Sequence, residues 1–185
     1  MPRLGMEPIR RAALVKATIV EVGQAASLDV TVGRIAARAG VSSALAHHYF
    51  GGKDQILNAA MRQILRDYRV TVVAALSGAT DRAAAIVTAS FAPTFFDPDT
   101  VSAWMTFYVQ AQGNPQASHL LGIYQRRLRS NLTHALRGQL ADPAAAADLL
   151  AALIDGLYIR QALAAPDTDA SAIALKLLGT LRAAG

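Results

Sequence analysis

Two short helical segments joined by a glycine turn constrain this sequence more than any other feature. Thr31 is a good N-cap for the first segment, because its hydroxyl can accept a hydrogen bond from a backbone N–H of the first turn. Gly40 allows the positive φ of a tight connection, and Ser42 or Ser43 can cap the second segment, which ends near Phe50. Small and apolar residues would let the segments cross closely and share one face; these are Ile35, Ala36, Ala39, Val41 and Leu45. The pattern predicts a helix-turn-helix, which places its second helix in a DNA major groove, although ordinary helical hairpins are also common.

Basic residues concentrate in the same part of the chain. The net charge is +5, from 18 Lys and Arg against 13 Asp and Glu. Residues 1–69 contain 10 basic and 5 acidic side chains and carry the whole excess, whereas residues 70–185 contain 8 of each. A basic N-terminal third beside a neutral remainder indicates a nucleic-acid-binding module joined to a second domain, although a small excess alone often serves only solubility.

The remaining sequence also predicts helices. Ala and Leu dominate, and runs of β-branched residues are short. Asp97–Pro98 and Asp142–Pro143 each place an N-cap residue before a proline at the first helical position, which is a strong start signal. We expect an all-α fold of about nine helices. The expected ranges are 8–26, 32–39, 43–50, 53–76, 81–91, 98–112, 116–140, 143–164 and 169–182, with Pro166 after the eighth.

These elements predict two domains joined by one long helix. We expect an N-terminal three-helix DNA-binding domain over residues 1–53 and a helical ligand-binding and dimerisation domain over residues 54–185. The two Ala- and Leu-rich helices at the end would form the dimer interface, because small residues let helices approach closely. Leu150 is an expected exposed apolar position in that interface.

The motif positions resemble the N-terminal signature of the TetR family of repressors. The resemblance rests on Thr31, Ile35–Ala36, Ala39–Ser42, Tyr49–Phe50, Lys53 and Leu57. It implies a homodimeric repressor of double-stranded operator DNA with a variable ligand-binding domain. Further blocks resemble a choline-responsive branch of this family, the repressors of glycine-betaine synthesis genes; these are residues 1–11, 48–50, 104–108, 114–115, 127–132 and 152–158. Tyr108 and Tyr158 stand where that branch is expected to have tryptophan.

The resemblance assigns a DNA-facing side to the helix-turn-helix. The groove-facing residues would be Ser43, Ala44, Leu45, His47 and His48, which can contact base edges, thymine methyl groups or phosphates. The phosphate contacts would come from Thr31, Tyr49, Lys53 and the helix N-terminus that Ser42 opens. Tyr49 could instead only pack against the turn. Five further basic residues could contact phosphates or form a solvated face; they are Arg10, Arg11, Lys16, Arg34 and Arg38.

Aromatic residues in the second half suggest a ligand site. Trp104, Phe107 and Tyr108 recur at spacings that share one helix face, and Tyr124 and Tyr158 come from later helices. Aromatic faces with one carboxylate, here Asp155, can hold a quaternary ammonium group through cation–π contacts. Such residues more often form an ordinary core. With the resemblance, they indicate a small quaternary ammonium inducer such as choline; the alternative is a TetR-type regulator of an efflux or catabolic operon with another inducer.

Several other classes of protein fit poorly. The chain lacks cysteine and the common nucleotide-binding and hydrolase motifs, so we expect neither an enzyme nor a cofactor. His47 and His48 are adjacent on one helix and point about 100° apart, so we expect no metal site. No apolar run is long enough to cross a membrane. We expect a cytoplasmic protein.

Overall fold

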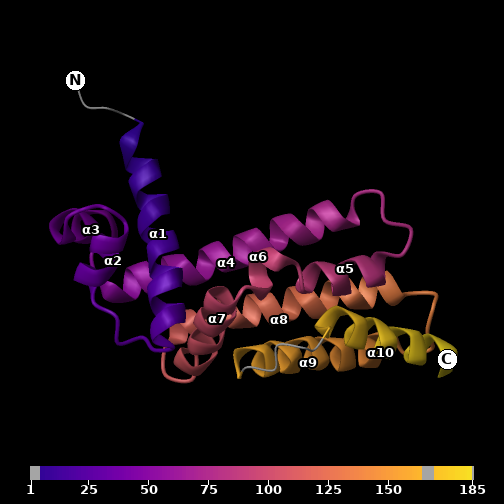
Figure 1. Cartoon of the computed structure of the whole chain (residues 1–185). Helices are drawn as coiled ribbons and strands as arrows, with labels where there is room; N and C mark the ends of the chain where they lie inside the picture. Colours follow the sequence, from indigo (N-terminus) through magenta and orange to yellow (C-terminus); the bar gives the residue numbers. More distant parts are fainter. Residues whose placement is uncertain (1–4, 164–168, 185) are drawn as a thin grey trace. The chain divides into compact units, whose positions relative to one another are not determined.

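The computed structural model describes residues 5–163 and 169–184, and all regular structure in these ranges is helical. The helices are α1 (Met6–Ala25), α2 (Val32–Arg38), α3 (Ser43–Phe50), α4 (Lys53–Leu76), α5 (Arg82–Ser90), α6 (Pro93–Phe96), α7 (Pro98–Gln110), α8 (Pro115–Leu136), α9 (Pro143–Ala162) and α10 (Ala170–Ala184) (Figure 1). The predicted all-α fold is confirmed. The sequence pattern missed the four-residue α6 and placed the end of α8 four residues too late. The predicted end of α9 at Ala164 and the break at Pro166 lie outside the described residues.

Contacts divide the chain into two compact units. Unit 1 comprises residues 1–64 and 98–118, and unit 2 comprises residues 65–97 and 119–185. The helix α4 therefore contributes its first half to unit 1 and its second half to unit 2. This grouping places α7 in unit 1, whereas the sequence predicted a boundary at residue 53; a functional boundary there stays a prediction.

In unit 1, α1 packs mainly against α7 and also contacts α2 and α3. The closest approach is at Gly23, where an added Cβ would overlap the backbone of Asp99. Ser102 strengthens the junction, because its hydroxyl donates a 2.7 Å hydrogen bond to the Gly23 carbonyl. The core around this junction includes Leu14, Val22 and Phe107, none of which is exposed.

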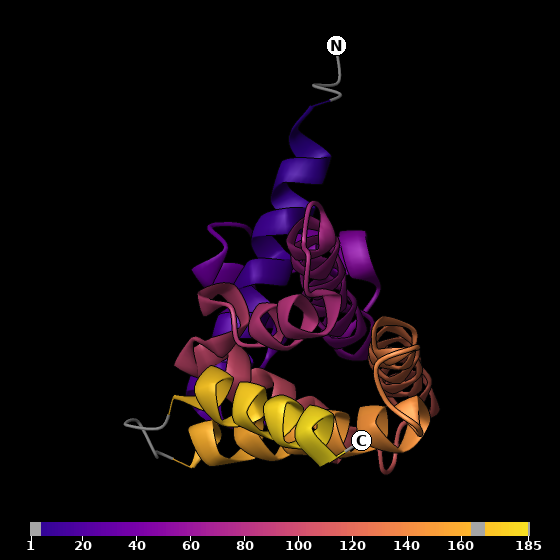
Figure 2. The same ribbon diagram turned by 90° about the vertical axis from the view of Figure 1, so that its right-hand side faces the viewer.

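In unit 2, α10 packs against α5 and α9, and α9 and α10 lie side by side in both views (Figures 1 and 2). Arg182 near the end of α10 donates hydrogen bonds of 2.7 and 2.8 Å to the carboxylate of Asp81, the N-cap of α5. These bonds hold the pKa of Asp81 at about 2, below its ordinary value. Leu150, Ile154 and Leu132 are fully buried in this unit.

Candidate DNA interface and ligand pocket

The helix-turn-helix has the local geometry that its sequence predicts. The Thr31 hydroxyl accepts a 3.2 Å hydrogen bond from the Arg34 backbone N–H and caps α2, and Ser42 caps α3 in the same way through Leu45. Gly40 has a φ of +67°, which confirms the predicted left-handed turn. Of the two serines that the sequence offered as caps, Ser42 is the one used.

The helix α3, which is the second helix of the helix-turn-helix, exposes the side that was predicted to face DNA. Ser43, Ala44, His47 and His48 are exposed, and Leu45 is half-buried. Ala46 is 1 % exposed and faces the core of unit 1. Tyr49 and Lys53 are half-buried at the end of α3 and the start of α4, and Thr31 and Ser42 are exposed. The arrangement can present hydroxyl, imidazole and apolar groups to a groove, with a lysine beside it.

Two of the five basic residues that could contact phosphates or form a solvated face have partners in unit 1. Arg34 and Arg38 on α2 both pair with Glu21 on α1, at 2.9 and 2.5 Å. The Glu21 side chain is only 6 % exposed. The hydrogen bond from Arg38 and the charge of Arg34 lower the pKa of Glu21 despite the cost of burial. Glu21 therefore fixes α2 on α1. No local pattern marks this pairing, because the partners lie 13 and 17 positions apart.

Arg11 connects the start of α1 with the end of α3. Its guanidinium carbon lies 5.3 Å from the ring centroid of Tyr49 and 5.2 Å from that of Phe50, within cation–π range. Arg11 also pairs with Glu7, one turn earlier, at 2.8 Å. Tyr49 thus contacts α1 through Arg11, and both of its predicted roles, packing against the turn and contact with phosphate, stay predictions.

Unit 2 brings together three of the predicted ligand residues. The Tyr124 hydroxyl donates a 3.0 Å hydrogen bond to the Asp155 carboxylate. Tyr158 donates to the Ser90 carbonyl, and the Tyr68 hydroxyl lies 3.0 Å from the Ser90 hydroxyl. We call these five residues the tyrosine cluster; they are Tyr68, Ser90, Tyr124, Asp155 and Tyr158. It combines three aromatic rings with one carboxylate.

Two tyrosines of the cluster, Tyr68 and Tyr158, have raised pKa values and are therefore neutral at ordinary pH. Burial and the nearby Asp155 charge raise the pKa of Tyr68 to about 12, although the Ser90 hydrogen bond acts in the opposite direction. Burial, Tyr68 and Asp155 raise the pKa of Tyr158 as well. The rings of Tyr68 and Tyr124 meet edge to face at 5.5 Å between centroids. Neutral tyrosine rings beside a carboxylate form a surface of negative potential that suits an organic cation.

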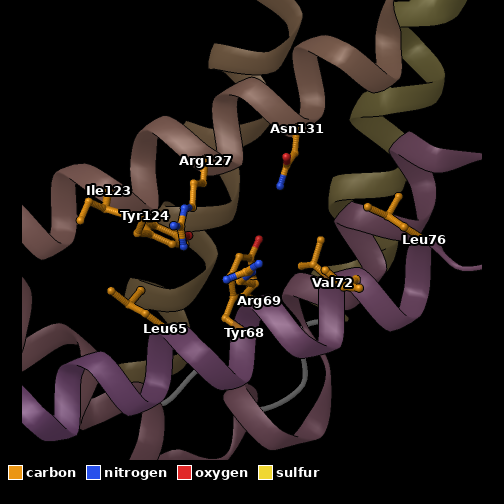
Figure 3. Close-up of a pocket in the computed structure, with 10 residues that line it drawn as sticks. Leu65, Tyr68, Arg69, Val72, Leu76, Ile123, Tyr124, Arg127 and Asn131 are labelled. Carbon is orange, nitrogen blue, oxygen red and sulfur yellow. The ribbon is translucent and has the colours of Figure 1, made fainter.

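A pocket of about 310 Å³ opens beside this cluster, between α4 and α8 (Figure 3). That volume lies at the small end of the usual range for ligand sites. Its walls are Leu65, Tyr68, Arg69, Val72, Val73, Leu76, Ile123, Tyr124, Arg127 and Asn131. Among the residues predicted as ligand contacts, only Tyr124 lines this pocket. Tyr68 and Arg69 were not predicted as pocket residues, because the sequence pattern indicated only that α4 joins the two domains and no motif marks these two positions.

The other predicted ligand residues lie on α7 in unit 1. Trp104 is 5 % exposed and Phe107 is fully buried. The rings of Trp104 and Tyr108 meet edge to face at 5.4 Å. The structure thus places Trp104, Phe107 and Tyr108 in one unit and Tyr124, Asp155 and Tyr158 in the other. A role of the α7 residues in ligand binding stays a prediction.

The surface of α9 and α10 bears exposed apolar side chains. Leu149 is 54 % exposed, Ile159 49 % and Ile173 40 %. Leu150, which was predicted to be exposed, is fully buried, because the helix turns it toward the core of unit 2 and its neighbour Leu149 outward. Within the described residues, no helix is long and apolar enough to span a membrane, and no group of three or more His, Asp or Glu could hold a metal ion.

Sequence comparisons match both parts of the chain to known families. Residues 14–60 match the bacterial regulatory proteins of the tetR family, and residues 79–182 match the C-terminal domain of BetI-type transcriptional repressors. The "HTH-type transcriptional regulator BetI" of Brucella melitensis is 52 % identical over 182 residues, which cover 95 % of this chain and 91 % of the relative. The protein of the same name from Agrobacterium fabrum is 52 % identical over 181 residues, 95 % of this chain and 88 % of that one.

Solved structures share the fold. A "putative transcriptional regulator" from Pseudomonas aeruginosa has a TM-score of 0.76 at 28 % identity, covering 98 % of this chain and 93 % of that chain. A regulator from Saccharomonospora viridis, solved "in complex with choline", has a TM-score of 0.81 at 22 % identity, covering 94 % and 95 %. The relatives are transcriptional regulators, which confirms that the chain is not an enzyme. This chain belongs to the TetR family of transcriptional regulators and is a repressor with a C-terminal domain of the BetI type.

Proposed function

We propose that this repressor binds a palindromic operator as a homodimer and controls genes for the conversion of choline to glycine betaine, with choline as its inducer. The proposal extends the BetI-type assignment to a ligand, a partner and a set of genes. A cytoplasmic location follows from action on bacterial DNA. The alternative, an efflux or catabolic operon with another inducer, is an outcome of the tests below.

The tyrosine cluster is the observation that supports the ligand. A trimethylammonium group needs apolar contact and negative potential together, and aromatic rings supply both at little desolvation cost. Tyr124 holds Asp155 by a hydrogen bond, and Asp155 is near enough to Tyr68 and Tyr158 to raise the pKa of both. The choline complex of the Saccharomonospora regulator, a protein of the same fold, fits this interpretation.

The exposed side of α3 supports the DNA contacts. Ser43, Ala44, Leu45, His47 and His48 would meet the major groove, and Tyr49, Lys53, Thr31 and the α3 N-terminus that Ser42 opens would meet phosphates. The dimer would form through the exposed apolar residues of α9 and α10. Two copies related by a twofold axis match the symmetry of a palindromic operator.

The long helix α4 offers a route from ligand to DNA. It begins at Lys53, beside the predicted phosphate contacts, and its last turns supply residues Tyr68, Arg69, Val72 and Leu76 to the pocket. Ligand would act through its preference for one of two dimer shapes with different spacing of the two α3 helices. The proposal also includes Trp104, Phe107 and Tyr108 on α7 as candidate ligand contacts.

A gel-shift experiment with the DNA upstream of the protein's own gene tests this function. We expect a retarded complex at low salt that dissociates on addition of millimolar choline but not of sodium chloride at equal ionic strength. Absence of any complex would contradict operator binding. A complex that choline leaves intact, together with no choline-dependent rise in melting temperature, would favour the alternative inducer.

A further inference from the structure

The pocket beside the tyrosine cluster has two chemically different ends. Tyr68 and Tyr124 form its inner wall, and Tyr124 is only 5 % exposed. Arg69, Arg127 and Asn131 are exposed and line its mouth. In Figure 3 Arg127 and Asn131 point into the pocket from α8, and Arg69 enters from α4.

The charge at the mouth is not neutralised inside the protein. Across residues 5–163 and 169–184, neither Arg69 nor Arg127 forms an ion pair with an acidic side chain, in contrast with Arg129, which pairs with Asp148 at 2.5 Å. Two guanidinium groups and an amide make several hydrogen-bond donors that suit a carboxylate. Choline offers them only a neutral hydroxyl oxygen, and its positive charge is repelled by both arginines.

We propose that Arg69, Arg127 and Asn131 form an anion subsite, so that the pocket binds small zwitterions with a carboxylate near a quaternary ammonium group more tightly than choline. This inference rests on the proposed function for the cationic half of the ligand, which the tyrosine cluster would hold. The carboxylate would lie at the mouth, where it remains partly hydrated, and the trimethylammonium group inside. The volume of about 310 Å³ fits a ligand of this size.

Four compounds of nearly the same shape allow the contributions of the positive and the negative charge to binding to be measured separately. Glycine betaine carries both charges, choline only the cation, 3,3-dimethylbutanoate only the carboxylate, and 3,3-dimethylbutan-1-ol neither. Calorimetry on the full-length protein at fixed ionic strength would measure all four. We expect glycine betaine to bind at least about 3-fold more tightly than choline, and the uncharged alcohol to bind most weakly.

Variants of the mouth identify the residues responsible. Arg127→Gln and Arg69→Gln should each weaken glycine betaine about 3- to 10-fold, while choline binding stays the same or improves, because a like charge has been removed. Arg126→Gln is the matched control, since Arg126 is the neighbour of Arg127 on α8, is also exposed and lines a different depression. All three changes are at exposed positions, so melting temperatures should stay close to that of the unmodified protein.

The outcomes distinguish the two proposals. If choline binds as tightly as glycine betaine, or if Arg127→Gln weakens both ligands equally, the anion subsite is wrong while the quaternary ammonium site stands. If 3,3-dimethylbutanoate binds as well as glycine betaine and depends on Arg127, the anion subsite is supported and the proposed inducer class is contradicted. If none of the four compounds binds, both proposals are wrong.

Discussion

The candidate DNA interface and the candidate ligand pocket are built over very different distances along the chain. On the DNA side, the interactions that shape the motif are short in sequence: Thr31 caps through Arg34, and Ser42 through Leu45. In the tyrosine cluster, the bonded partners Ser90 and Tyr158 lie 68 positions apart. A single substitution on α3 should therefore alter one contact, whereas a substitution in the cluster should affect several helices.

The first prediction concerns the dimer, on which operator binding would depend. Leu149→Glu combined with Ile159→Glu places charges on the exposed apolar surface of α9, and we expect monomers and a loss of operator affinity of at least about 100-fold. Light scattering and gel shifts would measure both effects. Val109→Glu is the control, because Val109 is 67 % exposed on α7 in unit 1. A double variant that remains dimeric would place the interface elsewhere.

The second prediction concerns Glu21, whose partners in unit 1 are not close to it in the sequence. Glu21→Gln should lower the free energy of unfolding by about 2 kcal/mol, because Arg34 and Arg38 lose the charge of a buried partner. Urea unfolding would measure the change. Glu7→Gln removes a 58 % exposed partner of Arg11 and should change stability far less. Equal effects of the two substitutions would mean that Glu21 is no more important than a surface charge.

The third prediction tests the carboxylate of the tyrosine cluster. Asp155→Asn preserves the shape of the side chain but removes its charge, so choline affinity should fall about 10-fold while operator binding without ligand is unchanged. Calorimetry and gel shifts would separate the two. Asp148→Asn, on the same helix but paired with Arg129 at the surface, is the control. Unchanged choline binding in Asp155→Asn would remove the carboxylate from the site.

The fourth prediction concerns a single contact on the DNA side. Lys53→Ala should weaken binding to all DNA sequences about 3- to 10-fold and lower the salt dependence by about one ion, because one phosphate contact is lost. His47→Ala should change the preference among bases instead. Titrations at several salt concentrations would tell these effects apart, with the exposed Lys176→Ala as control. A loss confined to one sequence would contradict the phosphate role of Lys53.

The fifth and smallest effect concerns pH. The pKa of Asp81 is held at about 2 by Arg182, so the pair stabilises unit 2 above the ordinary carboxylate pKa, and this stabilisation is lost as the pH falls toward 2. Because the Asp81 side chain is 41 % exposed, we expect only about 1 kcal/mol at neutral pH. Asp81→Asn should remove this contribution and flatten the acid dependence of unfolding, while an asparagine can still cap α5. A stability profile identical to that of the unmodified protein would contradict the prediction.

Sequence reasoning recovered the features that local chemistry determines. The caps Thr31 and Asp142, a cap at Ser42 or Ser43, and the left-handed Gly40 follow from side-chain and backbone preferences within a few residues. Helix periodicity also predicted α4 to the residue. These signals act within one helical turn, so an isolated sequence contains them in full.

The same reasoning failed where packing between distant segments determines which side chains are buried and which residues become neighbours. Leu150 and Leu149 are both leucines in an Ala-rich helix, and only the tertiary contacts of α9 determine which one faces the core. Tyr68 lies in α4, the helix that was predicted only to join the two domains. Its neighbours Ser90 and Tyr124 are 22 and 56 positions away along the chain. Aromatic spacing on α7 grouped Trp104 with the later tyrosines; because spacing along one helix does not say which other helices it will meet, this grouping stays a prediction.

The junction between α1 and α7 makes Gly23 a position where the absence of a side chain is itself the structural requirement. In a library that samples every amino acid at every position, glycines such as Gly113 and Gly156 should accept alanine, because nothing lies within 4 Å of the added carbon and neither has a positive φ. Position 23 should instead behave like a filled core position and reject even alanine, since the Asp99 backbone occupies the space. A selection for repressor function would thus mark this junction from sequence counts alone.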